Sequence, residues 1–174
     1  GAERSVAETC FPMKVALGHV LNLLTKNIDF LFLPSIINLH KMDEDMTDSF
    51  VCPYVQSFPY TVRSAVDFEA AGVEMLTVPL YLQLGERSLV EGMAKIARKL
   101  GRSVRQVRKA VAAGLKAQEE FESALRKRGQ EVLGNLPEDR PAIVVVSRSY
   151  NGCDPGANLE IPRKLRNMGV LAIP

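Results

Sequence analysis

The sequence lacks the long hydrophobic runs and the cysteine pattern of membrane and secreted proteins. Its longest apolar stretch, around residues 28–37, is interrupted by Asp29 and Pro34 and falls short of the roughly 20 residues that span a bilayer. The chain has three cysteines, an odd number, and its N-terminus does not resemble a signal peptide, so no disulfide framework is predicted. We therefore expect a cytoplasmic protein with no membrane partner, in which cysteines are more often metal ligands or reactive thiols.

A strong charge of either sign is also missing. The chain has 22 Lys and Arg against 20 Asp and Glu, a net charge of +2, whereas dedicated nucleic-acid binders usually carry a clear basic excess. The local basic run Arg126–Lys127–Arg128 is interpreted as the solvated face of a helix. We expect no nucleic-acid partner, and a hydrophobic content of 47% is sufficient for a packed core.

Common catalytic motifs are absent as well. The sequence has no GxSxG, Walker A or HExxH motif and no GxGxxG after a strand, so neither a serine hydrolase nor a P-loop ATPase is indicated. No catalytic residue is predicted from the sequence.

What is present is an alternation of strand-like and helix-like segments, which predicts an α/β fold with a parallel sheet flanked by helices. A capping box at Ser103 and Gln106 starts a long helical arm. The expected helices are 12–26, 60–71, 86–100, 103–133 and 161–167, with Gly72 and Gly101 as C-terminal caps of the second and third, and the expected strands are 28–33, 73–78, 142–146 and 169–174.

The pattern also predicts two domains. We expect an α/β cysteine-bearing domain over 1–134 that ends with the long helix, a polar, proline-bearing linker over 135–141, and the opening strand–helix–strand of a second α/β domain over 142–174. The final strand has no sheet of its own to complete, so we expect the chain to be a truncated fragment. No internal repeat is found.

Two loops are candidates for function. The segment from Pro34 to Pro59 has no periodicity, contains an acidic cluster and is too apolar at its flanks for disorder, so we interpret it as a functional loop. The segment 150–158 follows the strongest strand and precedes a helix. Ligands of open α/β sheets favour the carboxyl ends of strands, which makes this segment a candidate ligand loop, with a plain turn-rich connection as the alternative.

Cys10 and Cys52 lie near prolines: Cys10 stands two residues before Pro12 at an expected helix start, and Cys52 directly precedes Pro53 in the first candidate loop. The N–H groups of a first helical turn stabilise negative charge on a nearby thiolate, and a proline after a ligand cysteine is familiar from iron–sulfur sites. A small buried apolar side chain is the alternative role of a free cysteine. Zinc bound by Cys10, His19, His40 and Cys52 is a further alternative, although no CxxC or HxxxH pair supports it.

Four parts of the chain resemble one family, the acyl-CoA dehydratase activase-related proteins, also called CoA-substrate-specific enzyme activases, whose C-terminal parts look like the iron–sulfur subunits of 2-hydroxyglutaryl-CoA dehydratase. The resemblance covers nearly the whole chain in order. The matching strings are Glu8-Thr-Cys-Phe-Pro12, Phe32-Leu-Pro-Ser-Ile-Ile-Asn-Leu39, Phe50-Val-Cys-Pro-Tyr-Val-Gln-Ser57 and Asp154-Pro-Gly-Ala-Asn158 with Ile161-Pro-Arg-Lys-Leu165.

The resemblance implies a 4Fe–4S cluster with Cys10 and Cys52 as two of three cysteine ligands and the third supplied from beyond residue 174. Cys153 departs from the residue types usual at its position and is not assigned as a ligand. Ser35 and Asn38 are expected to donate hydrogen bonds to the cluster or substrate, with capping of a turn as the alternative. An isolated fragment with two ligands is expected to hold the cluster incompletely or to lack it.

The resemblance also implies partners and a reaction class. The partners are the ATP-binding activase domains of the parent chain and an acyl-CoA substrate, and the cluster relays electrons driven by ATP hydrolysis. The fragment alone is expected to be inactive, whereas the parent resembles activators or components of 2-hydroxyacyl-CoA dehydratases. The alternative is a non-catalytic acyl-CoA- or partner-binding module with structural cysteines, and the long helix could also join domains as a scaffold. The sequence leaves the substrate and the oligomeric state open.

Overall fold

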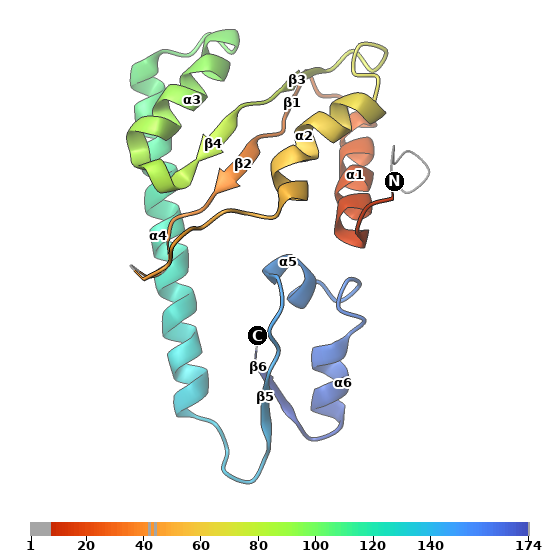
Figure 1. Cartoon of the computed structure of the whole chain (residues 1–174), viewed down its shortest axis with the longest axis vertical. Helices are drawn as coiled ribbons and strands as arrows, with labels where there is room; N and C mark the ends of the chain where they lie inside the picture. Colours follow the sequence, from red (N-terminus) through yellow and green to blue (C-terminus); the bar gives the residue numbers. More distant parts are fainter. Residues whose placement is uncertain (1–7, 42, 44, 174) are drawn as a thin grey trace. The chain divides into compact units, whose positions relative to one another are not determined.

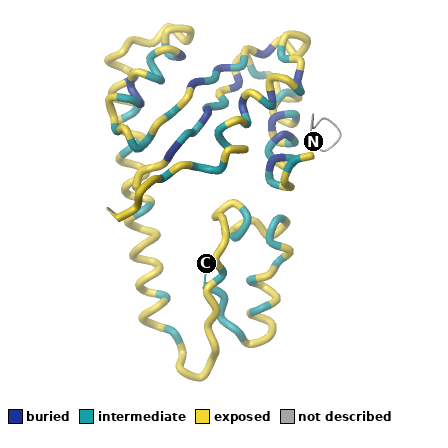
Figure 2. The backbone as a smooth tube through the Cα atoms, viewed as in Figure 1, coloured by how far each residue is buried: buried dark blue, intermediate teal, exposed yellow. Residues whose placement is uncertain are grey.

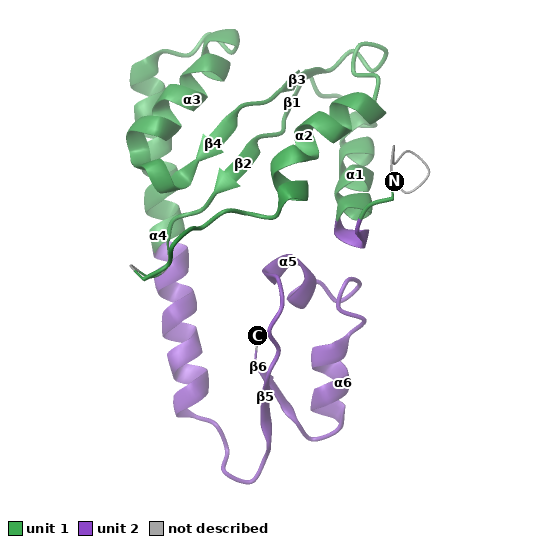
Figure 3. Ribbon diagram, in the orientation of Figure 1, with its two compact units in different colours: residues 1–9, 13–119 green, residues 10–12, 120–174 purple. Residues whose placement is uncertain are grey.

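The structure is a computed structural model that describes residues 8–41, 43 and 45–173. It divides the chain into two compact units (Figure 3). Unit 1 comprises residues 1–9 and 13–119, and unit 2 comprises residues 10–12 and 120–174. The division falls inside a long helix, whereas the sequence suggests a boundary at 135–141, and the domain boundaries stay a prediction.

Unit 1 is built on two parallel strand pairs joined by a crossover helix (Figure 1). β1 (Phe30–Phe32) pairs with β3 (Glu74–Leu76), and β2 (Ser35–Asn38) pairs with β4 (Pro79–Tyr81). Helix α2 (Pro53–Ala65) lies between the two halves in sequence, as a parallel connection requires. Backbone hydrogen bonds continue across the break between the pairs, from Leu33 N to Leu76 O at 2.9 Å and from Ser35 N to Val78 O at 3.0 Å.

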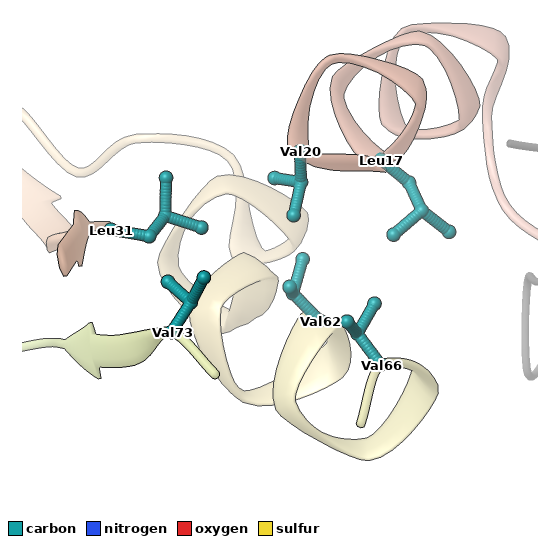
Figure 4. Close-up of a cluster of buried hydrophobic side chains, with 6 residues drawn as sticks. All are labelled: Leu17, Val20, Leu31, Val62, Val66 and Val73. Carbon is teal, nitrogen blue, oxygen red and sulfur yellow. The ribbon is translucent and has the colours of Figure 1, made fainter. Parts of the chain in front are cut away.

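The core of unit 1 lies where α1 (Phe11–Leu24) and α2 pack together with the strands (Figure 4). From residue 13 onward α1 runs in the same direction as α2 (Figure 1). Val62 of α2 is completely buried, and burial of apolar side chains of this size supplies most of the stability of such a unit. The buried members of this cluster are Leu17, Val20, Leu31, Val62, Val66 and Val73.

A second, smaller cluster fixes α3 (Gly85–Lys99) against the strands, through Leu76, Val78 and Ile96. α3 follows the short 3-10 helix η2 (Leu82–Leu84) and ends as the sequence predicts. Gly101 has φ +65°, its N–H donates to Arg98 O at 3.2 Å, and Arg102 N–H donates to Ala97 O at 2.8 Å. These two bonds form a Schellman motif, which satisfies carbonyl groups at the helix end.

The long arm is α4 (Val104–Gly134), and the capping box at its start is confirmed. Gln106 Oε1 accepts from Ser103 N at 2.9 Å, and Ser103 Oγ accepts from Gln106 N at 3.3 Å. The last part of α4 belongs to unit 2.

Unit 2 further contains β5 (Ala142–Val144), the short helix α5 (Ser149–Gly152), α6 (Ile161–Asn167) and β6 (Leu171–Ile173). β5 and β6 pair in parallel, and α6 has the bounds that the sequence predicts. In the segment 150–158 the expected loop includes α5, which the sequence pattern does not indicate. None of the described residues of unit 2 is buried, whereas buried positions follow the strands and helices of unit 1 (Figure 2).

Two predictions for the middle of unit 1 are wrong. The loop expected from Pro34 to Pro59 contains β2 and the first half of α2, so the segment without helix or strand is limited to 39–52. The helix expected over 60–71 begins at Pro53 and ends at Ala65, because Pro53 occupies the first helical position, which needs no N–H. Pro59 lies inside the helix, a location that usually disrupts helices, but its ring is fully buried in the core.

The predicted C-terminal end of the strand expected over 73–78, stopped by Pro79, is also wrong. β3 ends at Leu76, and Pro79 instead opens β4. Proline is tolerated there because the first residue of a strand need not donate to the ladder. Gly72 has the left-handed backbone expected of a helix cap, with φ +65°. It does not cap α2, however, because α2 ends at Ala65 and Gly72 follows a turn.

The predicted fold class is confirmed: the structure is α/β, with helices around short parallel strand pairs and a long helix. Within the described residues, no helix combines the length and the apolar character needed to cross a bilayer.

Candidate functional site

Cys52 is the N-cap residue of α2 and has an extended backbone, with φ −52° and ψ 135°. Its carbonyl accepts hydrogen bonds from Val55 N at 2.8 Å and Gln56 N at 3.1 Å. Its side chain forms no capping bond, and its thiol is free in a partly exposed position. The fold therefore leaves the sulfur accessible at the positive end of a helix.

Ser35 and Gln56 anchor the helix turn that follows Cys52. The Ser35 side chain, 1% exposed, donates from Oγ to Gln56 O at 2.6 Å, and Gln56 Nε2 donates to Val51 O at 2.8 Å. Strand β2 thus holds the first turn of α2, and Gln56 ties that turn back to the residue before Cys52. The backbone on both sides of the thiol is fixed by these two bonds.

Asn38 performs a similar task at the end of β2. Its side chain is 5% exposed, and its Oδ1 accepts from Gln83 N at 3.0 Å, where β4 gives way to the 3-10 helix η2. The backbone of Asn38 forms an antiparallel bridge with Phe50, and Val51 N donates to Ile37 O at 3.1 Å. The returning end of the 39–52 loop is therefore fastened along β2, directly before Cys52.

These contacts bear on the roles expected for Ser35 and Asn38. The Ser35 hydroxyl and the Asn38 side-chain oxygen both bond to backbone atoms of this chain. Their contribution to binding a cofactor stays a prediction, and the bonds that they make favour a positioning role. The sequence does not predict that Gln56 and Gln83 help to hold this loop. A signal exists for Gln56 alone: a proline directly after Cys52 is typical of a helix start, and such a start places Gln56 in the first turn.

Cys10 immediately precedes α1 and is an exposed free thiol. The division into units assigns Cys10 to unit 2 and Cys52 to unit 1, so their action as a pair stays a prediction. The adjacent helix turn carries an ion pair between Lys14 Nζ and Glu8 Oε2 at 3.3 Å.

The other residues considered as metal ligands do not add to these two thiols. His19 on α1 is exposed, and so is His40 in the loop. Cys153 is an exposed free thiol of unit 2. Among the residues that the structure describes, no three or more His, Cys, Asp or Glu side chains are grouped so that they could hold a metal ion.

The candidate ligand loop of unit 2 lines a cavity of about 420 Å³. Its backbone is held by its own side chains: Asp154 Oδ1 accepts from Ala157 N at 2.7 Å, and Asn158 Nδ2 donates to Gly152 O at 2.7 Å. Asn158 Oδ1 also accepts from Glu160 N at 2.8 Å. The cavity lies beyond the carboxyl end of β5, the location that the sequence suggests for a ligand.

Comparison with known proteins identifies the family of the chain. The family model described as "CoA enzyme activase uncharacterised domain (DUF2229)" matches residues 1–174, and no curated protein or solved structure matches the chain. This match confirms the resemblance to acyl-CoA dehydratase activase-related proteins. Since the family model covers the chain from its first to its last residue, the chain belongs to the CoA enzyme activase uncharacterised domain family.

Proposed function

We propose that the chain is the cysteine-bearing part of a dehydratase-like iron–sulfur protein, with Cys10 and Cys52 as thiolate ligands of a 4Fe–4S cluster. The observation that carries this proposal is the state of Cys52. Its thiol is free, partly exposed and without a capping bond, although it occupies a position where a side chain usually bonds to the helix. Such a sulfur is available to an external acceptor.

The donor chemistry fits an iron–sulfur cluster, while the number of donors is incomplete. Cysteine thiolates are the usual ligands of such clusters, and neither Cys10 nor Cys52 is buried. The described residues supply no group of three ligands. The proposal therefore requires further thiolates from outside the chain, in agreement with the third ligand that the family resemblance implies.

Local structure supports a pair of similar ligand positions. Cys10 and Cys52 each directly precede a helix, and a proline follows within two residues of each. The helical segments that follow, residues 13–24 and α2, pack into the same core cluster of unit 1 and run in the same direction (Figure 1). Each thiol therefore lies at the N-terminal end of a helix, where a helix presents N–H groups that have no partner within the helix.

The remaining residues of the proposed site would act by positioning. Ser35 and Gln56 fix the first turn of α2, and Asn38 holds the end of β2 through Gln83. When bound, the cluster supplies one-electron redox chemistry. The chain itself holds the thiolates at defined positions, and it relies on ATP-binding activase domains to drive electron transfer in acyl-CoA dehydratase or reductase chemistry.

The test is anaerobic reconstitution of the chain with iron and sulfide, in the presence of glutathione as an external thiol that can supply the missing ligands. We expect iron and sulfide to bind in equal amounts and to protect Cys10 and Cys52 from iodoacetamide. The variants Cys10→Ala and Cys52→Ala should each lower the iron content, whereas Cys153→Ala serves as the matched control and should not. Equal iron content in the wild type and in both single variants would overturn the proposal.

A non-catalytic acyl-CoA- or partner-binding module is the second candidate. It is favoured by the exposed apolar side chains of Leu39, Phe50 and Tyr54, which flank the loop and the start of α2. Calorimetry with acyl-CoA thioesters on metal-free protein separates the two candidates. Binding that is unchanged in Cys10→Ala and Cys52→Ala, together with failure to retain iron, would favour this module.

A further inference from the structure

We propose that unit 2 contains a binding site for the carboxylate of a small organic acid, in the cavity formed by the 152–163 segment together with Arg166, Val145 and Ala172. This site does not include Cys10 or Cys52. All its lining residues lie in unit 2, so the inference does not depend on the arrangement of the two units.

The size and lining of the cavity suit a small organic molecule. Its volume of about 420 Å³ lies within the range of roughly 300–1,000 Å³ that is usual for small-molecule sites, which are mostly apolar with few polar groups. The apolar part of the lining consists of Val145, which directly follows β5, Pro155 of the connecting segment, Pro162 of α6 and Ala172 of β6.

The charges of the lining select an anion. Three charged side chains line the cavity: Glu160, Arg163 and Arg166. Arg163 is paired with Glu160, whereas Arg166 has no ion-pair partner among the described residues. Two arginines and one glutamate leave one net positive charge, which matches a monocarboxylate better than a doubly charged phosphate ester.

The backbone of the segment is fixed in a strained conformation. Leu159 and Glu160 have φ values of 52° and 58°, and two successive non-glycine residues in this left-handed region are unfavourable. The Asn158 side chain holds the strained turn, since its Nδ2 donates to Gly152 O and its Oδ1 accepts from Glu160 N. As a result, the Glu160–Arg163 pair lies at the cavity, and Arg163 is already neutralised before a ligand arrives.

Cys153 provides a built-in probe, because its exposed thiol lines the same cavity. We would titrate the 174-residue chain with hexanoate, hexanamide, acetate and hexyl phosphate. The rate at which iodoacetamide modifies Cys153 would be followed by peptide mass spectrometry, with Cys10 and Cys52 as references in the same sample. Amide chemical shifts of Gly152 and Ala172 give a second readout that involves no thiol.

We expect hexanoate to slow modification of Cys153 alone, with a dissociation constant of roughly millimolar order for a ligand of this size. Hexanamide lacks the charge and acetate lacks the apolar chain, so both should bind at least about tenfold more weakly. Arg166→Gln should weaken hexanoate by about tenfold, the effect of losing one charge-assisted hydrogen bond. Arg140→Gln, which removes an arginine of the same unit outside the lining, should not.

Several outcomes would overturn the proposal. Among the ligands, these are equal binding of hexanoate and hexanamide, or tighter binding of hexyl phosphate than of hexanoate. Among the readouts, they are slowed modification of all three cysteines, or no effect of any probe on the amide shifts. An Arg166→Gln variant that binds hexanoate like the wild type would also overturn it. A circular dichroism spectrum of Arg166→Gln that matches the wild type shows that lost binding is not lost folding. The iron binding proposed for Cys10 and Cys52 is measured separately, so failure here leaves the proposed function untouched.

Discussion

Replacement of Ser35 by alanine tests whether β2 controls the thiol of Cys52. The substitution removes the 2.6 Å hydrogen bond from Ser35 Oγ to Gln56 O, at a side chain only 1% exposed. A buried hydrogen bond contributes about 1 kcal/mol net, and an acceptor that loses its partner in the interior raises this to about 1–3 kcal/mol. Alanine leaves a small void but no steric clash, so the loss of the bond dominates.

Two measurements follow from this magnitude. We expect the free energy of unfolding of the chain, from urea titration followed by circular dichroism, to fall by about 1–3 kcal/mol. We also expect iodoacetamide to modify Cys52 faster in native buffer, because the first turn of α2 opens more often when its anchor is lost. The rate at Cys10, which this bond does not hold, should not change.

Ser64→Ala is the matched control for this experiment. Ser64 is an exposed serine of the same helix, and its Oγ bonds only to Tyr60 O within that helix. Its replacement should change the free energy of unfolding by no more than about 0.5 kcal/mol. If Ser35→Ala and Ser64→Ala had the same stability and the same rate at Cys52, Ser35 would not position the turn, and our account of the loop would be refuted.

Substitutions at three positions test the fold around the site. A Cβ at Gly92 would lie 3.5 Å from Val78 Cγ2 and from Leu80 Cδ2, an ordinary contact distance. Alanine therefore fits, and Gly92→Ala should raise the urea midpoint because alanine favours the helix by about 0.5–1 kcal/mol over glycine. Gly92→Val should lower the midpoint, because the larger side chain overpacks the core. Ser103→Ala removes one side of the capping box and should cost about 1 kcal/mol, with faster amide hydrogen exchange in the first turn of α4; unchanged exchange would contradict that role. Cys52→Ser should stabilise α2 by about 0.5–1 kcal/mol, because a serine oxygen can accept a hydrogen bond from a first-turn N–H. If the variant were less stable than the wild type, the sulfur would make packing contacts that its partial exposure does not indicate.

Local signals along the sequence predict some elements well. α6 has the predicted bounds Ile161–Asn167, and the capping box at Ser103 marks the start of α4 within one residue. Both depend on residues within a single helical turn of each other. Such interactions are readable because neither a distant strand nor a distant helix is needed to form them.

Elements set by distant partners could not be read in this way. β2 is only four residues long, and it is a strand because it pairs with Pro79–Tyr81, more than 40 residues later. The sequence places the helix start after Pro59, because a proline usually marks a helix boundary. In the structure Pro59 lies inside α2, and burial of its ring in the core offsets the helical hydrogen bond that proline cannot donate. In both cases tertiary packing decided between conformations that the local sequence leaves close in energy.

The candidate site shows the same division. The position of Cys52 beside a helix-initiating proline could be read from adjacent residues, once Pro53 is recognised as a first helical residue. The partners of Ser35 and Asn38 are separated from them by 21 and 45 residues, and no local pattern identifies Gln56 or Gln83. Local sequence therefore predicts that Cys52 lies at a helix start, whereas the bonds that hold its loop depend on residues far along the chain.

The capping geometry shows what a cysteine at position 52 costs the helix. The N-cap position favours serine, threonine, aspartate or asparagine, whose oxygen atoms accept from the first turn. The Cys52 side chain makes no such bond, so the helix forgoes stability that a single-atom change to serine would supply. Under the proposed function, what sulfur offers in exchange is a ligand for iron. A Cys52→Ser variant that is more stable than the wild type but retains less iron would show both sides of this exchange, whereas one that is more stable and retains the same iron would leave the cysteine without a function at this position.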